Sequence, residues 1–244
     1  MRALRADLHV HTALSPCAAE EMTPPAIVEA AVKVGLAMIA ICDHNSAGNT
    51  AAVQEAAGRR LSVLAGMEIT TAEEVHVLGL FPDAQHARCA AEEVGATLPE
   101  YASSGAEPDR QALMDAKGRT VGMETRMLAA ASGLSLQQTV QLIRRHDGLA
   151  IASHVDRQAF GILGQLGFFP EDAGFDAVEV SCAGQKAGRR AEFEAFGYPV
   201  VFSSDSHFLS DIGSAFTVCE VRAPAFDEMA LALKRTGGRR ICHA

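Results

Sequence analysis

The stretch Leu4-Arg-Ala-Asp-Leu-His-Val-His-Thr12 places two histidines at the end of a short apolar run. The run Leu4–Val10 has the length and residue types of a buried β-strand. His9 and His11 are two residues apart, and side chains at that spacing point to the same side of a strand. The sequence therefore predicts a first strand that delivers two imidazoles to one end of a sheet.

The same pattern of an apolar run followed by a helical stretch continues along the chain. The other predicted strands are Ala37–Cys42, Leu61–Ile69, Val75–Phe81, Leu149–Ser153, Ala177–Ser181, Pro199–Ser203 and Thr217–Val221. The predicted helices are Ile27–Val34, Ser46–Ala57, Leu136–Arg145, Gln158–Leu166, Lys186–Phe196 and Ala225–Arg235. Most of the runs are continuously apolar, which is typical of strands buried on both faces of a parallel sheet. Repeated β-α units with right-handed crossovers then favour a closed α/β barrel.

One segment interrupts this alternation. Residues Pro99–Met123 are rich in Ser, Gly, Asp and Lys. We interpret them as an insertion, either a small helical subdomain or lid, or a disordered loop. The expected organisation is a single barrel domain over residues 1–244 that carries this insertion.

Composition and charge narrow the function classes. The formal net charge of −9 disfavours broad, nonspecific nucleic-acid binding, which needs a basic surface. A small phosphorylated substrate is still expected, because bound metal ions can dominate the local field around an anion. No apolar stretch approaches the roughly 18 residues of a membrane span, so no membrane partner is expected. The six cysteines are scattered without a CxxC pair, which is typical of reduced thiols in a cytoplasmic protein. The sequence does not indicate an oligomeric state.

Histidines and acids recur where the predicted strands end. These residues are His9, His11, Asp43, His44, Glu68, His76, His154, Asp205 and His207. In a barrel the carboxyl ends of all strands open on one face, so these side chains converge on one rim. Imidazole nitrogens and carboxylate oxygens are ligands for zinc, manganese and iron. The pattern predicts a metal centre at that rim.

The ordered series of motifs resembles the PHP (polymerase and histidinol phosphatase) family. The motifs are His9-Val-His11-Thr12, Asp43-His44, Gly66-Met-Glu68, His76, Ser153-His154 and Ser204-Asp205-Ser-His207, between Asp7 and Ile212. The resemblance implies a distorted (β/α)7 barrel. It also implies a metal-dependent phosphoesterase, a phosphatase or phosphodiesterase, that hydrolyses a phosphorylated metabolite or nucleotide with metal-activated hydroxide.

The resemblance also implies ligand roles for two or three divalent Mn, Zn or Fe ions. His9, His11, Glu68 and Asp205 would hold the first ion, with Glu68 bridging to a second. His76 and His154 would complete the second site, and His44 and His207 would help to hold a third. Asp43 would orient His44 or a nearby ligand, unless it is the N-cap of the helix that follows.

One departure concerns the third ion. Many family members carry an aspartate ligand where this chain has Pro16 in the stretch His11-Thr-Ala-Leu-Ser-Pro16-Cys17. Proline offers no ligand atom. Cys17 or Glu21 could take its place, and a cysteine would favour zinc or iron. The alternative is a centre with two metal ions.

Substrate contacts are expected on the same rim. Arg157 follows His154 by three residues and could grip a phosphate in bidentate fashion, or form a surface ion pair. Asp205 or His207 could pass a proton to the leaving group. Lys186, Arg189 and Arg190 open a predicted helix, where such residues usually form a solvated face. Two other function classes stay open, a non-catalytic metal-binding module and a metal-dependent amide hydrolase.

Overall fold

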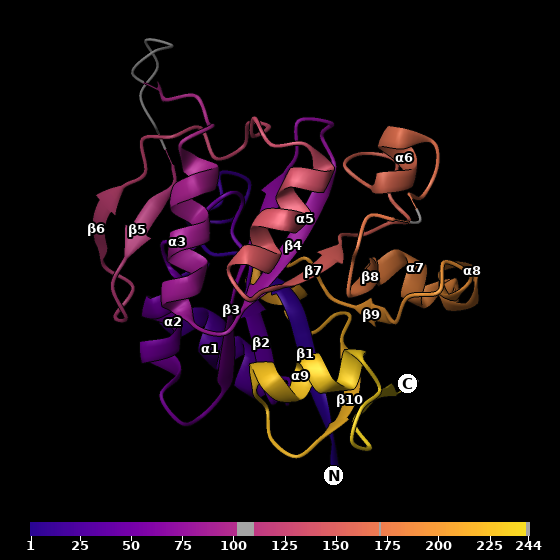
Figure 1. Cartoon of the computed structure of the whole chain (residues 1–244). Coiled ribbons are helices and arrows are strands. Elements are labelled where there is room, and N and C mark those ends of the chain that lie inside the picture. The colour runs from indigo at the N-terminus through magenta and orange to yellow at the C-terminus, as the bar shows by residue number, and fades with distance from the viewer. Residues whose placement is uncertain (102–109, 171, 243–244) are drawn as a thin grey trace.

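The computed structural model describes residues 1–101, 110–170 and 172–242. In these ranges the strands form one nine-stranded sheet and a two-stranded sheet (Figure 1). The strands are β1 Arg2–Val10, β2 Met38–Ile41, β3 Ser62–Thr70, β4 His76–Phe81, β5 Ala112–Met114, β6 Thr120–Met123, β7 Leu149–Ala152, β8 Ala177–Val180, β9 Val200–Phe202, β10 Thr217–Val221 and β11 Arg240–Cys242. The order in the large sheet is β11-β10-β1-β2-β3-β4-β7-β8-β9.

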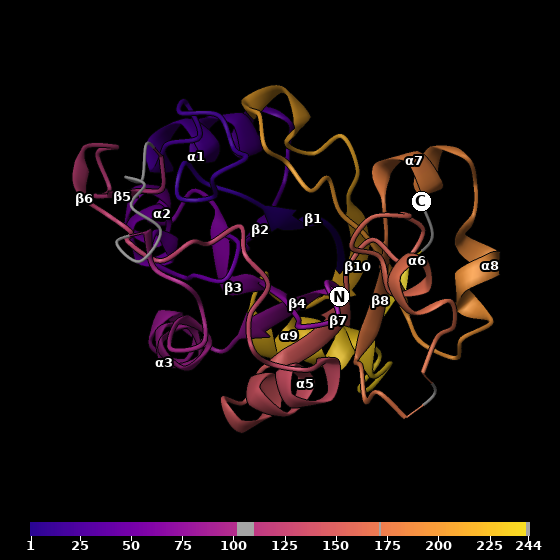
Figure 2. The same ribbon diagram turned by 90° about the horizontal axis from the view of Figure 1, so that it is seen from above.

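Helices cover the outside of this sheet. They are α1 Pro24–Lys33, α2 Thr50–Ala57, α3 Ala84–Gly95, α5 Leu136–Arg145, α6 Ile162–Leu166, α7 Cys182–Lys186, α8 Arg190–Glu194, α9 Phe226–Leu233 and the 3-10 helix η1 Leu209–Asp211. Seen from above, the central strands surround a common axis, with α1, α2, α3 and α5 outside them (Figure 2). Helix α9 packs Met229, Ala232 and Leu233 against the apolar interior. The fold class is confirmed as a mixed α/β protein whose sheet is a nearly closed barrel.

The expectation of a parallel sheet is wrong in two places. Strand β4 is antiparallel to both β3 and β7, and β10 is antiparallel to both β1 and β11. Only a short connection, residues 71–75, joins β3 to β4. A connection of that length permits a hairpin but not the crossover that parallel strands need.

The end of β1 closes the barrel. Residues Arg2–Ala6 pair with β10, while Val10 forms a parallel bridge with Ser206, beyond β9. The Ser206 amide donates to the His9 carbonyl at 3.2 Å, and the His11 amide donates to the Ser206 carbonyl at 3.0 Å. One edge of β1 thus pairs first with β10 and then, near its end, with Ser206. The pairing with Ser206 brings the segment after β9 to the rim.

A β-bulge in β1 decides which way its histidines point. Asp7 pairs with Ile39 and Val10 pairs with Ile41, so β1 carries one extra residue in this interval. Leu8 belongs to the interior cluster, but Val10 packs in the outer layer. Bulges of this kind re-aim side chains beside functional sites. Because of the bulge, His9 and His11 enter the inside of the rim.

The segment predicted as an insertion contains a β-hairpin where it is described. Strands β5 and β6 pair antiparallel, so the expectation of a helical subdomain is not met over residues 110–123. Residues 102–109 of the predicted insertion lie outside the described residues. The Ala112 amide donates to the Ala13 carbonyl at 3.2 Å, and the Met114 amide donates to Asn49 Oδ1 at 2.8 Å. The hairpin is therefore fastened to the loops at the rim.

Other differences are smaller. Helix α3 was not predicted, and the predicted helix Lys186–Phe196 is replaced by the short helices α7 and α8. All six cysteines are free thiols. None of the helices in the described ranges has the length and hydropathy to span a membrane.

The close approach of β2, β3 and β4 makes Gly66 a sensitive position. A Cβ atom there would lie 2.7 Å from Cys42 Sγ and 2.9 Å from the Ile41 carbonyl oxygen. Relief of the contact with the Ile41 carbonyl would require a shift of the backbone of β2, which costs conformational free energy. We expect Gly66→Ala to lower the free energy of unfolding by about 1–3 kcal/mol, as overpacking does.

Chemical denaturation of the two proteins measures this difference. Gly122→Ala is the matched control, because a Cβ atom at that strand position meets its first neighbour, Leu113 Cδ1, at 3.8 Å. If both variants unfold at the same denaturant concentration, the close packing around Gly66 is not what limits its size.

Candidate metal centre

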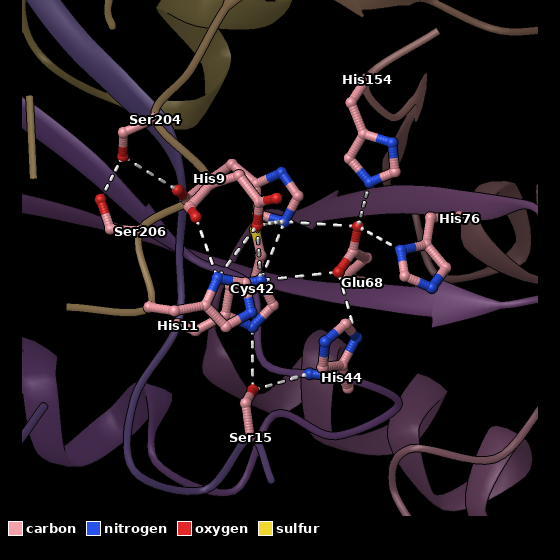
Figure 3. A network of polar contacts seen from close by, with 12 residues as sticks. His9, His11, Ser15, Cys42, His44, Glu68, His76, His154, Ser204 and Ser206 are labelled. Atoms are coloured by element: carbon pink, nitrogen blue, oxygen red, sulfur yellow. Dashed lines mark hydrogen bonds and ion pairs between the residues drawn. The ribbon is translucent and has the colours of Figure 1, made fainter. Parts of the chain in front are cut away.

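The carboxylate of Glu68 is the centre of the rim. It is 1% exposed and lies at the end of β3 (Figure 3). Ring nitrogens of five histidines surround it within 3.5 Å. The distances from its oxygens are 2.9 Å to His76, 3.1 Å to His44, 3.2 Å to His154, 3.4 Å to His9 and 3.5 Å to His11. One buried carboxylate therefore faces five imidazoles from four separate places in the sequence.

The predicted ligands come together in three overlapping groups of the described residues. Within each group the donor atoms lie within 4.8 Å of one another. The groups are His9, His11, Glu68 and Asp205; His44, Glu68 and His76; and His11, His44 and His207. His154 joins them through Glu68. All eight residues predicted as ligands therefore lie at one rim.

Two of these residues have unusual backbone conformations. Asp205 has φ of +52° and His154 has φ of +25°. L-residues adopt such angles rarely, and they persist where the surrounding structure enforces them, often at functional sites. In both residues the backbone follows a strand end and turns so that the side chain reaches the rim.

Asp43 supports the centre from behind. It accepts hydrogen bonds from the Thr12 amide at 2.7 Å and from Ser15 Oγ at 2.7 Å. Ser15 Oγ in turn lies 2.9 Å from His11 Nδ1 and accepts from the His44 amide at 3.1 Å. Asp43 thus acts on His11 through Ser15. The residue that precedes α2 is Asn49, so Asp43 is not the N-cap of that helix.

Glu179 was missed by the sequence analysis. Its carboxylate is 1% exposed on β8, and its Oε2 lies 3.1 Å from His9 Nδ1. The same oxygen accepts from the His154 amide at 3.1 Å. The sequence holds one signal for it, an acid inside the apolar strand Ala177-Val-Glu179-Val180, where a charge needs a buried partner.

The charges of the centre stabilise one another. Burial would raise the pKa of Glu68, but the charges of His76, His9 and His44 hold it well below its usual range. Asp205 behaves in the same way, because His9 and His11 outweigh its burial and hold its pKa well below the usual value. Burial keeps the pKa of His11 well below its usual value. At His9 and His44 the neighbouring carboxylates outweigh burial, raising the pKa of His9 well above its usual value and that of His44 to about 10. The centre therefore presents ionised carboxylates beside a neutral His11 and protonated His9 and His44, whose protons a bound metal ion would displace.

The two candidate substitutes for the aspartate absent at Pro16 lie in different places. The Cys17 thiol is in hydrogen-bonding contact with His207 and His44, and their effect outweighs burial and lowers its pKa to about 6. Cys17 and Glu21 are both exposed and neither belongs to the three donor groups, but Cys17 contacts His44 and His207, which do. The geometry favours Cys17 over Glu21 as an additional ligand.

The predicted substrate contacts border the donor groups. Arg157 Nη1 lies 2.5 Å from Asp205 Oδ2, and its side chain is 42% exposed. His207 Nδ1 lies 3.0 Å from the Asp205 carbonyl oxygen, with 21% of its side chain exposed. The ion pair of Arg157 is thus made with a residue of the centre and not with a remote surface acid.

Comparisons with known proteins identify the chain as a family member. The family model of the PHP domain matches residues 7–166, and that of the PHP-associated segment matches residues 185–236. The 5'-3' exoribonuclease Rnm of Escherichia coli is 35% identical over 86 residues, which are 33% of this chain and 28% of that protein.

Two solved structures share the fold. The lesion-specific endonuclease PfuEndoQ from Pyrococcus furiosus has a TM-score of 0.70 at 20% identity, over 98% of this chain and 58% of that one. An amidohydrolase from Chromobacterium violaceum has a TM-score of 0.60 at 19% identity, over 86% of this chain and 90% of that one. This chain thus spans less than two thirds of Rnm and of PfuEndoQ.

These findings correct the expected partner. A small phosphorylated substrate was expected, and nucleic acid was disfavoured because of the net charge. Rnm is named as an exoribonuclease, and a second endonuclease Q structure holds a 27-mer DNA duplex with an abasic lesion. Net charge averages over the whole surface, whereas a phosphate at a metal centre responds to the charges within a few ångströms.

The match to the first family model covers more than half of the sequence, and the geometry of the rim accords with it. The chain belongs to the PHP domain family of metal-dependent phosphoesterases.

Proposed function

We propose that this protein is a metal-dependent phosphodiesterase that cleaves nucleic-acid strands. The observation that carries the proposal is the Glu68 carboxylate, buried among the ring nitrogens of five histidines. A buried charge is costly unless it is paired or coordinates a metal. So many imidazoles around one carboxylate exceed what hydrogen bonding to two oxygens requires.

The donor set fits divalent cations. His76 Nδ1 lies 2.9 Å from Glu68 Oε1, yet it is buried without a hydrogen-bond partner among the described residues. His9 Nε2 and His11 Nε2 approach each other to 3.1 Å with Asp205 Oδ1 at 3.3 and 3.1 Å. Donor atoms that converge in this way leave their lone pairs directed at a shared point, as ligands of one ion do.

The proposed ligands draw on the three donor groups and add His154 and Cys17, which border them. His9, His11, Glu68 and Asp205 would hold one ion, and Glu68 with His76 and His154 a second. His44, His207 and Cys17 would hold a third. Divalent ions at this rim, Mn, Zn or Fe, would neutralise charge on phosphoryl oxygens and activate water for an in-line displacement.

Two residues of the chain complete the proposed reaction. Arg157 would leave Asp205 for a phosphoryl oxygen of the substrate, to which its guanidinium can donate in bidentate fashion. In a centre with two ions, His207, whose side chain is 21% exposed, would carry the proton to the leaving oxygen, whereas as a ligand of a third ion it would hold metal instead. Strands from residue 2 to residue 242 build the one large sheet, so we also propose that residues 1–244 act as one domain. In it, the hairpin at 110–123 forms a wall beside the rim.

Nucleic acid is the proposed substrate because the similarity to relatives points to it. Rnm, which shares 35% identity over 86 residues, is an exoribonuclease by name. Endonuclease Q, of the same fold, is a DNA endonuclease. A phosphodiester strand also suits a rim on which Arg157 stands beside the donor groups.

The first test removes the shared carboxylate. We expect Glu68→Gln to lose bound metal and to lower hydrolysis of bis(p-nitrophenyl) phosphate and of single-stranded RNA by at least about 100-fold. Elemental analysis after dialysis and initial rates with added manganese or zinc measure both. Glu55→Gln, an exposed substitution on α2, is the control.

The wild-type protein decides among the function classes. Two or more ions per chain without phosphate-ester hydrolysis would favour a non-catalytic metal-binding module. Hydrolysis of amides alone would favour the amide hydrolase. Fewer than two ions at saturation would reject the metal centre itself.

The second test concerns Cys17. If its thiolate is a ligand, the Co²⁺-loaded protein will show the near-ultraviolet charge-transfer absorption of a sulfur–cobalt bond, and Cys17→Ser will lack it. Cys89→Ser, which changes a thiol on α3, should keep the band. An identical spectrum in Cys17→Ser would exclude sulfur ligation by this residue.

The third test concerns Glu179. We propose that its carboxylate fixes the ring of His9, so Glu179→Gln should weaken metal binding by about 10–100-fold. Competition with a chromophoric chelator gives the dissociation constant. Asp172→Asn, an exposed acid, serves as control. An affinity equal to that of the wild type, in a protein with an unchanged melting temperature, would show that His9 keeps its orientation without Glu179.

A further inference from the structure

A second concave site adjoins the metal centre. It lies between the loop after β7 and the segment that contains α7, and its volume is about 640 Å³. Its walls include Asp156, Arg157, Ser181, Gly184, Lys186 and Arg189. Arg157 belongs to both places, because its guanidinium also contacts Asp205 of the centre. Arg157 is therefore the boundary between the two places, and a molecule bound at the metal centre can extend beyond it into this cavity.

Among the residues that line the cavity, positively charged side chains outnumber negatively charged ones. Three of the side chains that line it, Arg157, Lys186 and Arg189, are cationic. The one carboxylate among its lining residues, Asp156, accepts hydrogen bonds from the Ser181 amide at 2.8 Å and from Ser181 Oγ at 2.6 Å. Arg189 pairs with Glu192 at 2.7 Å. Lys186 is exposed and forms no ion pair with a carboxylate of residues 1–101, 110–170 or 172–242. An anionic group would supply the partner that Lys186 lacks.

The wall that carries Lys186 is fixed in place. A Cβ atom on Gly184 would lie 2.5 Å from both Asp156 Oδ2 and Val180 Cγ1, so α7 sits directly on Asp156 and on the end of β8. Ser181 accepts a hydrogen bond from the Gly184 amide at 3.2 Å while it donates to Asp156. Cationic groups on a fixed frame lose less entropy on binding an anion than groups on a loose loop.

We propose that this cavity, walled by Arg157, Lys186 and Arg189, binds a non-scissile phosphate of the strand whose scissile phosphodiester lies at the metal centre. The inference rests on the proposed function and adds to it a substrate preference. A strand bearing a second phosphate beside the cleaved bond is held at two points, whereas a substrate with one phosphate is held at one. The cavity also explains how a chain of net charge −9 can select a polyanion.

The test compares substrates that differ in that second phosphate alone. The dinucleotide ApA has one phosphate, while pApA and ApAp add one at either end. We expect the metal-loaded, full-length protein to cleave one of the longer anions with at least about tenfold higher kcat/KM than ApA, as a charge-assisted contact provides. The double variant Lys186→Ala/Arg189→Ala should lose this preference and keep the wild-type rate on bis(p-nitrophenyl) phosphate.

The control is Arg190→Ala, which removes one positive charge next to Arg189, on a side chain that pairs with Glu194 and does not line the cavity. It should retain the preference. An unchanged preference in the double variant, or none in the wild type, overturns the proposal.

A binding measurement separates this proposal from the proposed function. If bis(p-nitrophenyl) phosphate, ApA, pApA and ApAp are all inert with every metal, the phosphodiesterase proposal fails. Calorimetric titration with pApA and ApAp then measures binding affinity and tests the phosphate site in the cavity independently of hydrolysis. Affinity about tenfold weaker in Lys186→Ala/Arg189→Ala than in Arg190→Ala supports a phosphate site, and equal affinity rejects it.

Discussion

The buried charge of Glu68 is the constraint on which the rim depends. A carboxylate with 1% exposure at the end of β3 must be compensated, and five imidazoles from the ends of four strands provide the compensation. Each of these imidazoles is also buried or nearly so, and needs its own partner. Glu68 is therefore the centre of a connected network of buried polar groups. The hydrogen bonds and ion pairs of this network fix the ends of several strands relative to one another.

Acidic residues outside the donor groups provide partners for these histidines. Asp43 acts through Ser15 on His11, and Glu179 acts on His9 and on the backbone of His154. Asp7 performs a similar task further out, since it accepts from the Ser204 and Gly213 amides and so anchors the segment that leads to Asp205. Burial raises the pKa of Asp7 to about 6, which shows how much desolvation this anchoring involves. The ligands are thus held by groups that never reach the substrate.

The sequence predicted the elements well because their apolar runs are long and their ends carry unusual residues. Eight strands and the histidines at their ends follow from that pattern alone. Strand direction did not follow, because β4 has the same buried, apolar composition that a parallel strand would have. The bulge in β1 was invisible for a related reason, since one added residue changes pairing without changing composition. Glu179 was missed because its partner, His9, is 170 residues away. The expectation against nucleic acid was wrong in view of the nucleases that the chain resembles, because net charge carries no information about where charges lie.

The bridge between Val10 and Ser206 has a consequence for how the protein is made. Ser206 joins the first strand to the segment after β9, and Asp205 and His207 flank it. A ribosome releases the five histidines around Glu68 well before these residues, and domains fold as their parts emerge. The nascent chain therefore holds an incomplete donor set until Ser206 docks beside β1. Closure of the barrel and completion of the rim are then one event, so a chain interrupted before residue 205 has neither a closed sheet nor the full charge to retain its ions.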